Sequence, residues 1–258
     1  MIEPEAAARL ALGLMDLTRL EADDEASAII SLCRRAATPF GPPAAICIHA
    51  EWLATARKTL RELGLEGSVR LATVANFPAG DADPGQAAAE VREALALGAD
   101  EVDVVFPWRR FMAGDDQAGR TLVSACREAC TERVLKVILE TGCLQSPRHI
   151  ERAGRIAIEA GADFLKTSTG KVAINATPEA ARILLETIRD SGADVGCKVS
   201  GGIRDTAQAQ AYLELAAEIM GADWITARHF RFGASGLLDD LLATLSDGPN
   251  AGRGRDAY

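Results

Sequence analysis

Two lysines and an aspartate interrupt apolar runs of the kind that form buried strands. Asp103 lies in Glu-Val-Asp-Val-Val-Phe-Pro, Lys166 in Asp-Phe-Leu-Lys-Thr-Ser-Thr-Gly-Lys, and Lys198 in Val-Gly-Cys-Lys-Val-Ser-Gly-Gly-Ile-Arg. A neutral lysine amine can attack a carbonyl carbon to form a Schiff base, and a carboxylate beside it can hold a water or move protons. Asp16 ends another such run, and we interpret it with equal weight as a fourth member of the group or as a helix or turn cap.

A single lysine at a strand end is as often a solvent-directed side chain as a catalytic one. Two lysines on neighbouring strands favour catalysis, because each ammonium disfavours the charge of the other and a partly dry site adds a desolvation cost of the same sign. Free lysine titrates near ~10.4, so about one molecule in a thousand or fewer is neutral at pH 7. Lowering the pKa by roughly three units makes the neutral amine a major species, which is how a Schiff-base lysine is activated.

Glycine-rich turns predict a separate phosphate site. Gly201-Gly202 follows the run that contains Lys198, and Gly233-Ala-Ser-Gly follows the last apolar run. Backbone N–H groups at such turns and at a helix N-terminus bind phosphate, and lysine or arginine side chains add positive charge. The predicted phosphate-binding residues are Thr169, Gly170, Lys171, Gly201, Gly202, Arg204, Ser235 and Gly236.

Short runs rich in Val, Ile and Leu recur roughly every thirty residues, and an alanine-rich helical pattern follows each of them. Near-continuous apolar runs are typical of parallel strands that are buried on both faces. On this count Asp103, Lys166 and Lys198 lie on the fourth, sixth and seventh strands. The predicted strands are Leu14–Leu17, Ala45–Ile48, Val69–Ala75, Glu101–Phe106, Val134–Leu139, Asp163–Lys166, Val195–Val199 and Phe230–Gly233.

The segments between the strands carry helix signals. Thr177 directly before Pro178 is typical of an N-cap followed by a first-turn proline. The tripeptide Gly-Ala-Asp occurs four times, each time where a helix is expected to end. The clearest predicted helices are Pro84–Leu97, Arg148–Ala160, Pro178–Asp190 and Thr206–Met220.

Eight strand–helix units predict an α/β fold, a single (β/α)8 barrel, for which about 250 residues is the usual length. A doubly wound open sheet is the main alternative, but its glycine-rich fingerprint is missing after the first strand. Residues 1–247 are expected to form the barrel with a short N-terminal helix. Residues 248–258 have the composition of a flexible tail and end in Tyr258. Because functional residues of barrels gather where strands end, the three charged residues are expected to meet there.

Composition excludes several classes of partner. The chain has 258 residues, 48% of them hydrophobic and 25% charged, with a formal net charge of −9, which argues against nucleic acid or an anionic membrane. No segment has the apolar length of a membrane span or the pattern of a secretory signal. The six cysteines form no C-x-x-C pair and the three histidines are widely separated, so a metal site has little support and a reduced, cytoplasmic protein is expected.

These motifs together resemble those of the deoxyribose-phosphate aldolases, a family of class I, Schiff-base-forming aldolases. The resemblance covers nearly the whole chain, from Leu-Met-Asp-Leu-Thr at 14–18 to Arg-Phe-Gly-Ala-Ser at 231–235. Its most specific parts are the Lys-Thr-Ser-Thr-Gly-Lys run that begins at Lys166 and the Lys-x-x-Gly-Gly-Ile-Arg run that begins at Lys198.

The resemblance implies reversible cleavage of 2-deoxy-D-ribose 5-phosphate to acetaldehyde and D-glyceraldehyde 3-phosphate. It implies that Lys166 carries the substrate imine and that Asp103 and Lys198 donate or accept protons. Tyr258 would reach the active site and help to move the C2 proton. No metal or cofactor is then expected. Because members of the family are often dimers, a homodimer is expected.

Two departures from the family pattern concern the substrate pocket. Val199-Ser200 stands where one branch has Pro-Ala, and Gly236 replaces a frequent second serine, which keeps a backbone N–H but loses a hydroxyl. Two alternative functions stay open. The chain could be another Schiff-base sugar-phosphate aldolase or a transaldolase with a different donor, or a non-catalytic sugar-phosphate sensor, although the intact set of Asp103, Lys166 and Lys198 speaks against the sensor.

Overall fold

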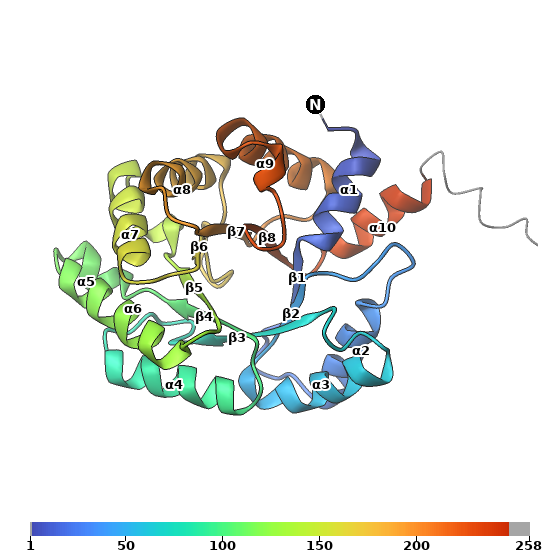
Figure 1. Ribbon diagram of the computed structural model, residues 1–258, viewed down its shortest axis with the longest axis horizontal. Helices are drawn as coiled ribbons and strands as arrows, with labels where there is room; N and C mark the ends of the chain where they lie inside the picture. The colour runs from blue at the N-terminus through green and yellow to red at the C-terminus, as the bar shows by residue number, and fades with distance from the viewer. Residues whose placement is uncertain (1, 248–258) are drawn as a thin grey trace, which may run out of the picture.

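The computed structural model describes residues 2–247, in which eight parallel strands pair in chain order and close into a barrel, with β8 beside β1 (Figure 1). The predicted (β/α)8 barrel and its N-terminal helix are therefore confirmed, and the predicted tail lies outside the described residues. The strands are β1 Met15–Thr18, β2 Ala45–Cys47, β3 Arg70–Ala75, β4 Glu101–Val105, β5 Val134–Ile138, β6 Phe164–Lys166, β7 Gly196–Ser200 and β8 Phe230–Ala234.

Helices surround the barrel and cover the outer face of the strands (Figure 1). They are α1 Pro4–Gly13, α2 Ala26–Arg35, α3 Leu53–Glu62, α4 Pro84–Ala96, α5 Trp108–Met112, α6 Asp116–Cys130, α7 Pro147–Glu159, α8 Pro178–Ser191, α9 Thr206–Met220 and α10 Leu237–Asp247. Short 3-10 helices lie at Ala50–Trp52, Thr141–Cys143 and Ala222–Trp224. Among the described residues, no helix is long and apolar enough to cross a membrane.

Local sequence signals explain where these elements begin and end. Each predicted strand agrees with the observed one to within one residue at either end, because apolar runs bounded by polar turns mark buried strands clearly. Thr177 caps α8, its side chain accepting a hydrogen bond from the Ala180 N–H at 3.1 Å. All four Gly-Ala-Asp glycines have a positive φ after a helix, which glycine adopts without strain.

The strands alternate between an apolar outer face, which packs on the helices, and an inner face that carries charge. Outward residues such as Leu135, Val137 and Leu165 are fully buried in the main hydrophobic core. Strand register then places inward charges beside one another, with Lys136 of β5 opposite Asp103 of β4 and Lys198 of β7 opposite Lys166 of β6. A buried polar layer therefore crosses the middle of an otherwise apolar barrel.

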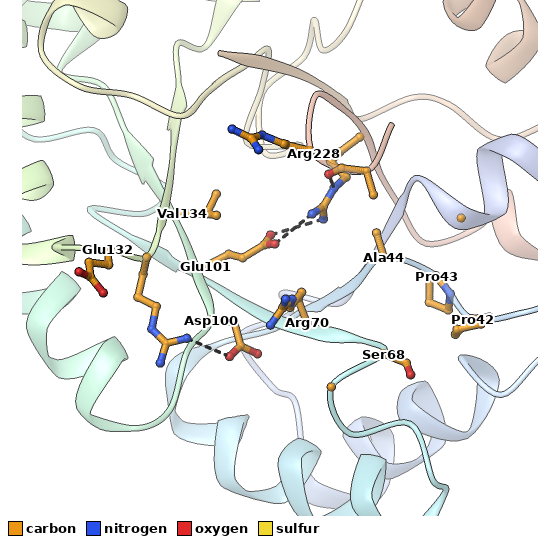
Figure 2. A pocket seen from close by; sticks show the side chains of 15 residues that line it. Pro42, Pro43, Ala44, Ser68, Arg70, Asp100, Glu101, Glu132, Val134 and Arg228 are labelled. Atoms are coloured by element: carbon orange, nitrogen blue, oxygen red, sulfur yellow. Dashed lines mark hydrogen bonds and ion pairs between the residues drawn. The ribbon is translucent and has the colours of Figure 1, made fainter. Parts of the chain in front are cut away.

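A cavity opens at each end of the barrel. One, of about 530 Å³, lies at the C-terminal ends of the strands and reaches Lys166. The other, of about 560 Å³, lies at the N-terminal ends, where Glu101 and Arg231 form part of its wall (Figure 2). The buried charges thus separate two cavities, and Lys166 lines the first of them, while Asp16, Asp103 and Lys198 lie fully buried beneath it.

Candidate active site

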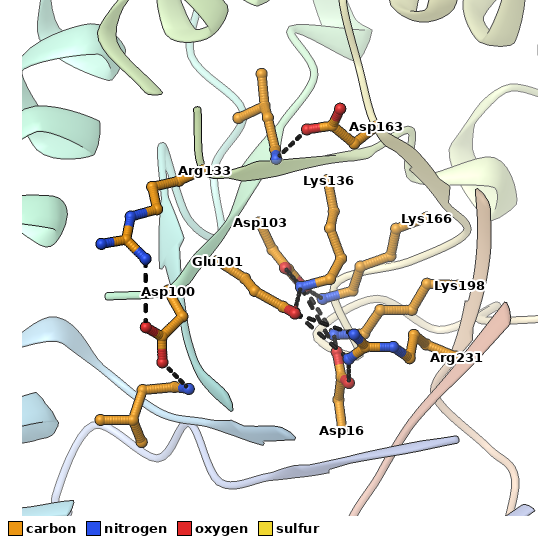
Figure 3. A network of polar contacts seen from close by, with 12 residues as sticks. Asp16, Asp100, Glu101, Asp103, Arg133, Lys136, Asp163, Lys166, Lys198 and Arg231 are labelled. Carbon is orange, nitrogen blue, oxygen red and sulfur yellow. Dashed lines mark hydrogen bonds and ion pairs between the residues drawn. The ribbon is translucent and has the colours of Figure 1, made fainter. Parts of the chain in front are cut away.

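Lys166 ends β6 with its side chain inside the barrel, only 3% exposed. Its ammonium nitrogen donates to Asp103 Oδ2 at 2.8 Å (Figure 3). The same residue lines the C-terminal cavity, so the amine is buried and yet within reach of a molecule bound there. This combination is what an imine-forming lysine requires, because the amine must be dry enough to lose its proton and open enough to meet a carbonyl.

Asp103 is the centre of the polar cluster. Its Oδ2 accepts from both Lys166 and Lys198, each at 2.8 Å, and its Oδ1 accepts from Lys136 at 2.7 Å. Asp16 contributes a second buried carboxylate that pairs with Lys198 at 2.5 Å and with Arg231 at 2.6 Å (Figure 3). Of the two interpretations of Asp16, the structure supports a member of the ionic network rather than a cap.

Three charged members of the cluster were not predicted from the sequence. Lys136 on β5 pairs with Asp103 and with Glu101 on β4, both at 2.7 Å, and Arg231 on β8 pairs with Glu101 at 3.0 Å. A period-two signal could have found them, since Glu101 lies two residues before Asp103 and Lys136 is a lone charge inside the apolar run Val-Leu-Lys-Val-Ile. Together with Asp16, the cluster contains three carboxylates and four cationic side chains.

Lys166 is the one lysine of the cluster whose pKa falls below its usual value. Burial is the largest cause, Asp103 opposes it, and the neighbouring Lys198 adds to the lowering. The prediction that Lys198 depresses the pKa of Lys166 agrees with this direction. The neutral amine is therefore more accessible at Lys166 than at an ordinary lysine.

The sequence argument that the two ammonium groups lower each other's pKa is wrong for Lys198. Burial disfavours the Lys198 ammonium, but Asp103 and Asp16 outweigh burial and raise its pKa to about 12. For Lys136, burial is likewise outweighed, by Asp103 first and Glu101 second, and its pKa is raised. Burial also opposes the charge of Asp103, but the three lysines hold the pKa of that carboxyl well below its usual range.

The predicted phosphate-binding residues all line the same cavity as Lys166. Gly201 and Gly202 both have φ near +83°, and a Cβ at Gly201 would lie 2.7 Å from the Asn175 side chain, so this turn requires glycine. Ser235 and Gly236 directly precede α10, whose first N–H groups have no partner within the helix. The cavity wall carries more cations than carboxylates, which suits an anionic ligand. Its cationic side chains are Arg19, Arg35, Lys166, Lys171 and Arg204.

Glu140 organises the loop that follows Lys166, a role that the sequence did not reveal. Its carboxylate is buried and accepts from the Thr169 N–H at 3.1 Å and from the Thr169 hydroxyl at 2.6 Å. The hydroxyl in turn accepts from the Lys171 N–H at 3.1 Å. Thr169 thus uses its own donors to hold the loop, and a direct contact of Thr169 with phosphate stays a prediction.

Tyr258, the last of the predicted catalytic residues, lies outside the described residues. Ser200 lies in the wall of the cavity, and within residues 2–247 its buried hydroxyl has no hydrogen-bond partner. The same residues contain no cluster of three or more metal-ligating side chains.

Comparison of the sequence with known families decides the class of protein. The model of the DeoC/LacD family of aldolases matches residues 10–243, which includes every strand of the barrel and the whole buried cluster. The chain belongs to the DeoC/LacD aldolase family. An aldolase of this family makes or breaks a carbon–carbon bond beside a carbonyl group, in agreement with an amine of lowered pKa at the end of a strand.

Solved structures from several organisms have the same fold. A candidate deoxyribose-phosphate aldolase from Toxoplasma gondii superposes with a TM-score of 0.87 at 24% identity, covering 98% of this chain and 100% of that one. A second candidate, from Coccidioides immitis, has a TM-score of 0.78 and 27% identity over 92% of this chain and 86% of that one. The tetrameric deoxyribose phosphate aldolase from Aeropyrum pernix has a TM-score of 0.72 and 24% identity over 95% and 93% of the two chains.

Proposed function

We propose that this aldolase cleaves 2-deoxy-D-ribose 5-phosphate reversibly to acetaldehyde and D-glyceraldehyde 3-phosphate through a Schiff base on Lys166. The observation that carries the proposal is the position of Lys166 between two environments. Its amine is buried in an ionic cluster, where burial first and Lys198 second lower its pKa against the opposing effect of Asp103. Lys166 also lines a cavity whose wall includes glycine-rich turns and cationic side chains. The names of the similar structures support the substrate, and the cradle supports its phosphate.

The first half of the reaction is the formation of an iminium. The neutral Lys166 amine attacks the C1 aldehyde of the substrate, and loss of water from the carbinolamine gives a cationic C=N bond. Lys198, whose pKa is raised, enters the reaction as an ammonium, favours the neutral form of its neighbour and shares in proton transfer. Asp103 accepts hydrogen bonds from both amines and, with a water bound in the cavity, relays protons at this step.

The second half breaks the carbon chain. The iminium withdraws electrons, so transfer of the C3 hydroxyl proton to Asp103 through its bound water cleaves C2–C3 and releases D-glyceraldehyde 3-phosphate. The enamine that remains on Lys166 is protonated at C2 and hydrolysed to acetaldehyde, which regenerates the amine. Tyr258 is our proposed carrier of the C2 proton. The iminium acts as the electron sink, so the mechanism as proposed uses no metal.

Phosphate recognition sets the position of the sugar in this scheme. The turns at Gly201-Gly202 and Ser235-Gly236 line the cavity beside Lys171 and Arg204, and we expect backbone N–H groups of these turns and of the start of α10 to bind the phosphate. The phosphate would be held at this end while C1 meets Lys166 at the other. Uncharged aldehydes would lose this anchor and bind more weakly.

Reductive trapping tests the proposal directly. Borohydride added with 2-deoxyribose 5-phosphate should attach the mass of the reduced substrate to the peptide that contains Lys166. An adduct confined to Lys198 or Lys171 would refute the assignment. Release of acetaldehyde from the same substrate in the presence of EDTA checks the reaction and its independence of metal in one assay.

The donor distinguishes this activity from that of other Schiff-base aldolases. We expect acetaldehyde to condense with D-glyceraldehyde 3-phosphate in the reverse direction, and dihydroxyacetone to be a poor donor. Turnover with dihydroxyacetone and none with acetaldehyde would instead indicate a transaldolase-like enzyme. Binding of 2-deoxyribose 5-phosphate with no trapped adduct on any lysine would indicate a sensor.

A further inference from the structure

Lys136 has more carboxylate partners than any other lysine of the cluster, although it does not reach the substrate cavity. Its ammonium nitrogen lies 2.7 Å from Glu101, 2.7 Å from Asp103 and 3.6 Å from Asp16, and the side chain is fully buried. A buried lysine of this kind, held by three carboxylates, is costly unless every charge around it is matched. Its presence therefore needs an explanation beyond packing.

The charges of the cluster do not balance when every group is ionised. Solvent touches only its ends, since Glu101 and Arg231 border the N-terminal cavity and Lys166 borders the C-terminal one, while the other members are fully buried (Figures 2 and 3). With all groups charged there is one cation too many, and loss of one proton makes the cluster neutral. Its carboxylates are Asp16, Glu101 and Asp103, and its cations are Lys136, Lys166, Lys198 and Arg231.

The number of carboxylate partners decides which cation gives up the proton. Lys198 and Arg231 each pair with two carboxylates, whereas Lys166 pairs with Asp103 alone and shares that oxygen with Lys198. Deprotonation of Lys166 therefore sacrifices the least ion-pair energy, because its charge has the fewest carboxylate partners in a dry environment.

We propose that Lys136 is a positioning residue that keeps Lys166 neutral. Lys136 pairs with Asp103 and is the fourth cation of the cluster, which leaves one positive charge in excess when every group is ionised. Lys136 donates to Oδ1 of Asp103, and Lys166 to Oδ2, so the two lysines share the charge of one carboxylate without touching each other. Without Lys136, three carboxylates face three cations, and Asp103 would hold the Lys166 proton more strongly. The inference rests on the proposed role of Lys166 as the imine-forming lysine.

No other titratable group is needed to explain the balance within the described residues. The titratable groups that act on Lys166 directly are Asp103 of β4, Lys198 of β7 and Cys47 of β2, and the other members of the cluster are Asp16 of β1, Glu101 of β4, Lys136 of β5 and Arg231 of β8. Cys47 does not change the count, because burial raises the pKa of its thiol and keeps it protonated.

The test measures how fast Lys166 forms an imine as a function of pH. Acetaldehyde and cyanoborohydride are added at pH values from 5 to 9, and peptide mass spectrometry follows the adduct on Lys166. Lys136→Met should move the acid limb of this profile to higher pH by about one unit, which is about a tenfold lower rate at pH 7. Glu101→Gln should move it in the opposite direction, since two carboxylates then face four cations.

The double variant Glu101→Gln/Lys136→Met separates a change of charge from simple damage. It contains two carboxylates and three cations, again one cation in excess, and its limb should return to the wild-type pH. A folded Lys136→Met or Glu101→Gln protein whose acid limb lies at the wild-type pH would overturn the inference. A double variant whose acid limb lies at the same pH as that of Lys136→Met would also overturn it. Should wild-type protein form no adduct on Lys166, the proposed function itself fails.

Discussion

Replacement of Lys198 by methionine is the most direct test of why Lys166 is reactive. The substitution keeps most of the side-chain volume and removes one ammonium from the buried cluster. Asp16 retains Arg231 at 2.6 Å, and Asp103 retains Lys136 at 2.7 Å, so neither carboxylate is left without a partner. The barrel should therefore still fold, and the change should fall on the chemistry.

The structure gives the size of the effect. Both amines lie 2.8 Å from the same oxygen of Asp103, so their nitrogens are no further apart than twice that distance. Two like charges about 5 Å apart repel by about 3 kcal/mol at the effective dielectric constant of ~20 that suits protein sites, or about two pKa units. Loss of Lys198 should raise the pKa of Lys166 by that amount and reduce the neutral fraction at pH 7 by about a hundredfold.

The assay is the pH dependence of kcat/KM for cleavage of 2-deoxyribose 5-phosphate. In Lys198→Met the acid limb should move about two units towards alkaline pH, and activity should recover as the pH is raised through that interval. Lys58→Met, which removes a largely exposed lysine on α3, is the matched control and should leave the profile unchanged. A uniform loss at every pH, with no shift of the limb, would show that Lys198 acts in proton transfer or binding and not through charge.

Three further predictions concern stability, packing and phosphate binding. The pKa of Asp103 is held below the value of ~3.9 that an aspartate has in the unfolded chain, so its contribution to stability is present above that pH and is lost as the pH falls below it. Urea unfolding measured from pH 7 to pH 2 should show this loss, and the free energy of unfolding should fall less steeply with decreasing pH in Asp103→Asn. In Gly233→Ala the new Cβ would lie 2.2 Å from the Ser200 hydroxyl, so kcat should fall while the far-ultraviolet circular dichroism spectrum is retained. Adding Ser200→Ala to this variant should restore part of kcat, and a double variant with no gain in kcat would contradict the contact. Arg204→Gln should raise KM for the phosphorylated sugar about fivefold and leave unphosphorylated deoxyribose unaffected, whereas Arg228→Gln, at the opposite end of the barrel, should change neither.

The sequence was sufficient to predict the barrel because a local sequence pattern marks each strand. Apolar runs such as Val134–Ile138 are bounded by polar turns. Eight strand–helix units in a chain of this length, without the glycine-rich fingerprint of a doubly wound sheet, then favour a closed barrel. The positions of Asp103, Lys166 and Lys198 followed from the same periodicity. Their expected meeting at the strand ends is only partly correct, because Lys166 ends β6 whereas Asp103 and Lys198 lie in the middle of β4 and β7 and meet it inside the barrel.

Partner choice inside the barrel could not be predicted in the same way. Which oxygen of Asp103 each amine uses depends on the stagger between β4, β5 and β6, and no local pattern encodes that stagger. The same limit explains why Lys198 was expected to have a lowered pKa, since the contact with Asp16 joins residues 182 positions apart. Glu140 was missed because its role depends on a loop that folds back onto it.

Burial alone would select the wrong lysine as the reactive one. Lys136 and Lys198 are completely buried, and Lys166 is 3% exposed, so a ranking by desolvation places Lys166 last. The pKa directions follow the opposite order, because both fully buried lysines have two or more carboxylates within ion-pair distance and Lys166 shares one. The carboxylates are numerous around Lys136 and Lys198 and sparse around Lys166, and this distribution is therefore what gives a lowered pKa to the lysine that lines the C-terminal cavity.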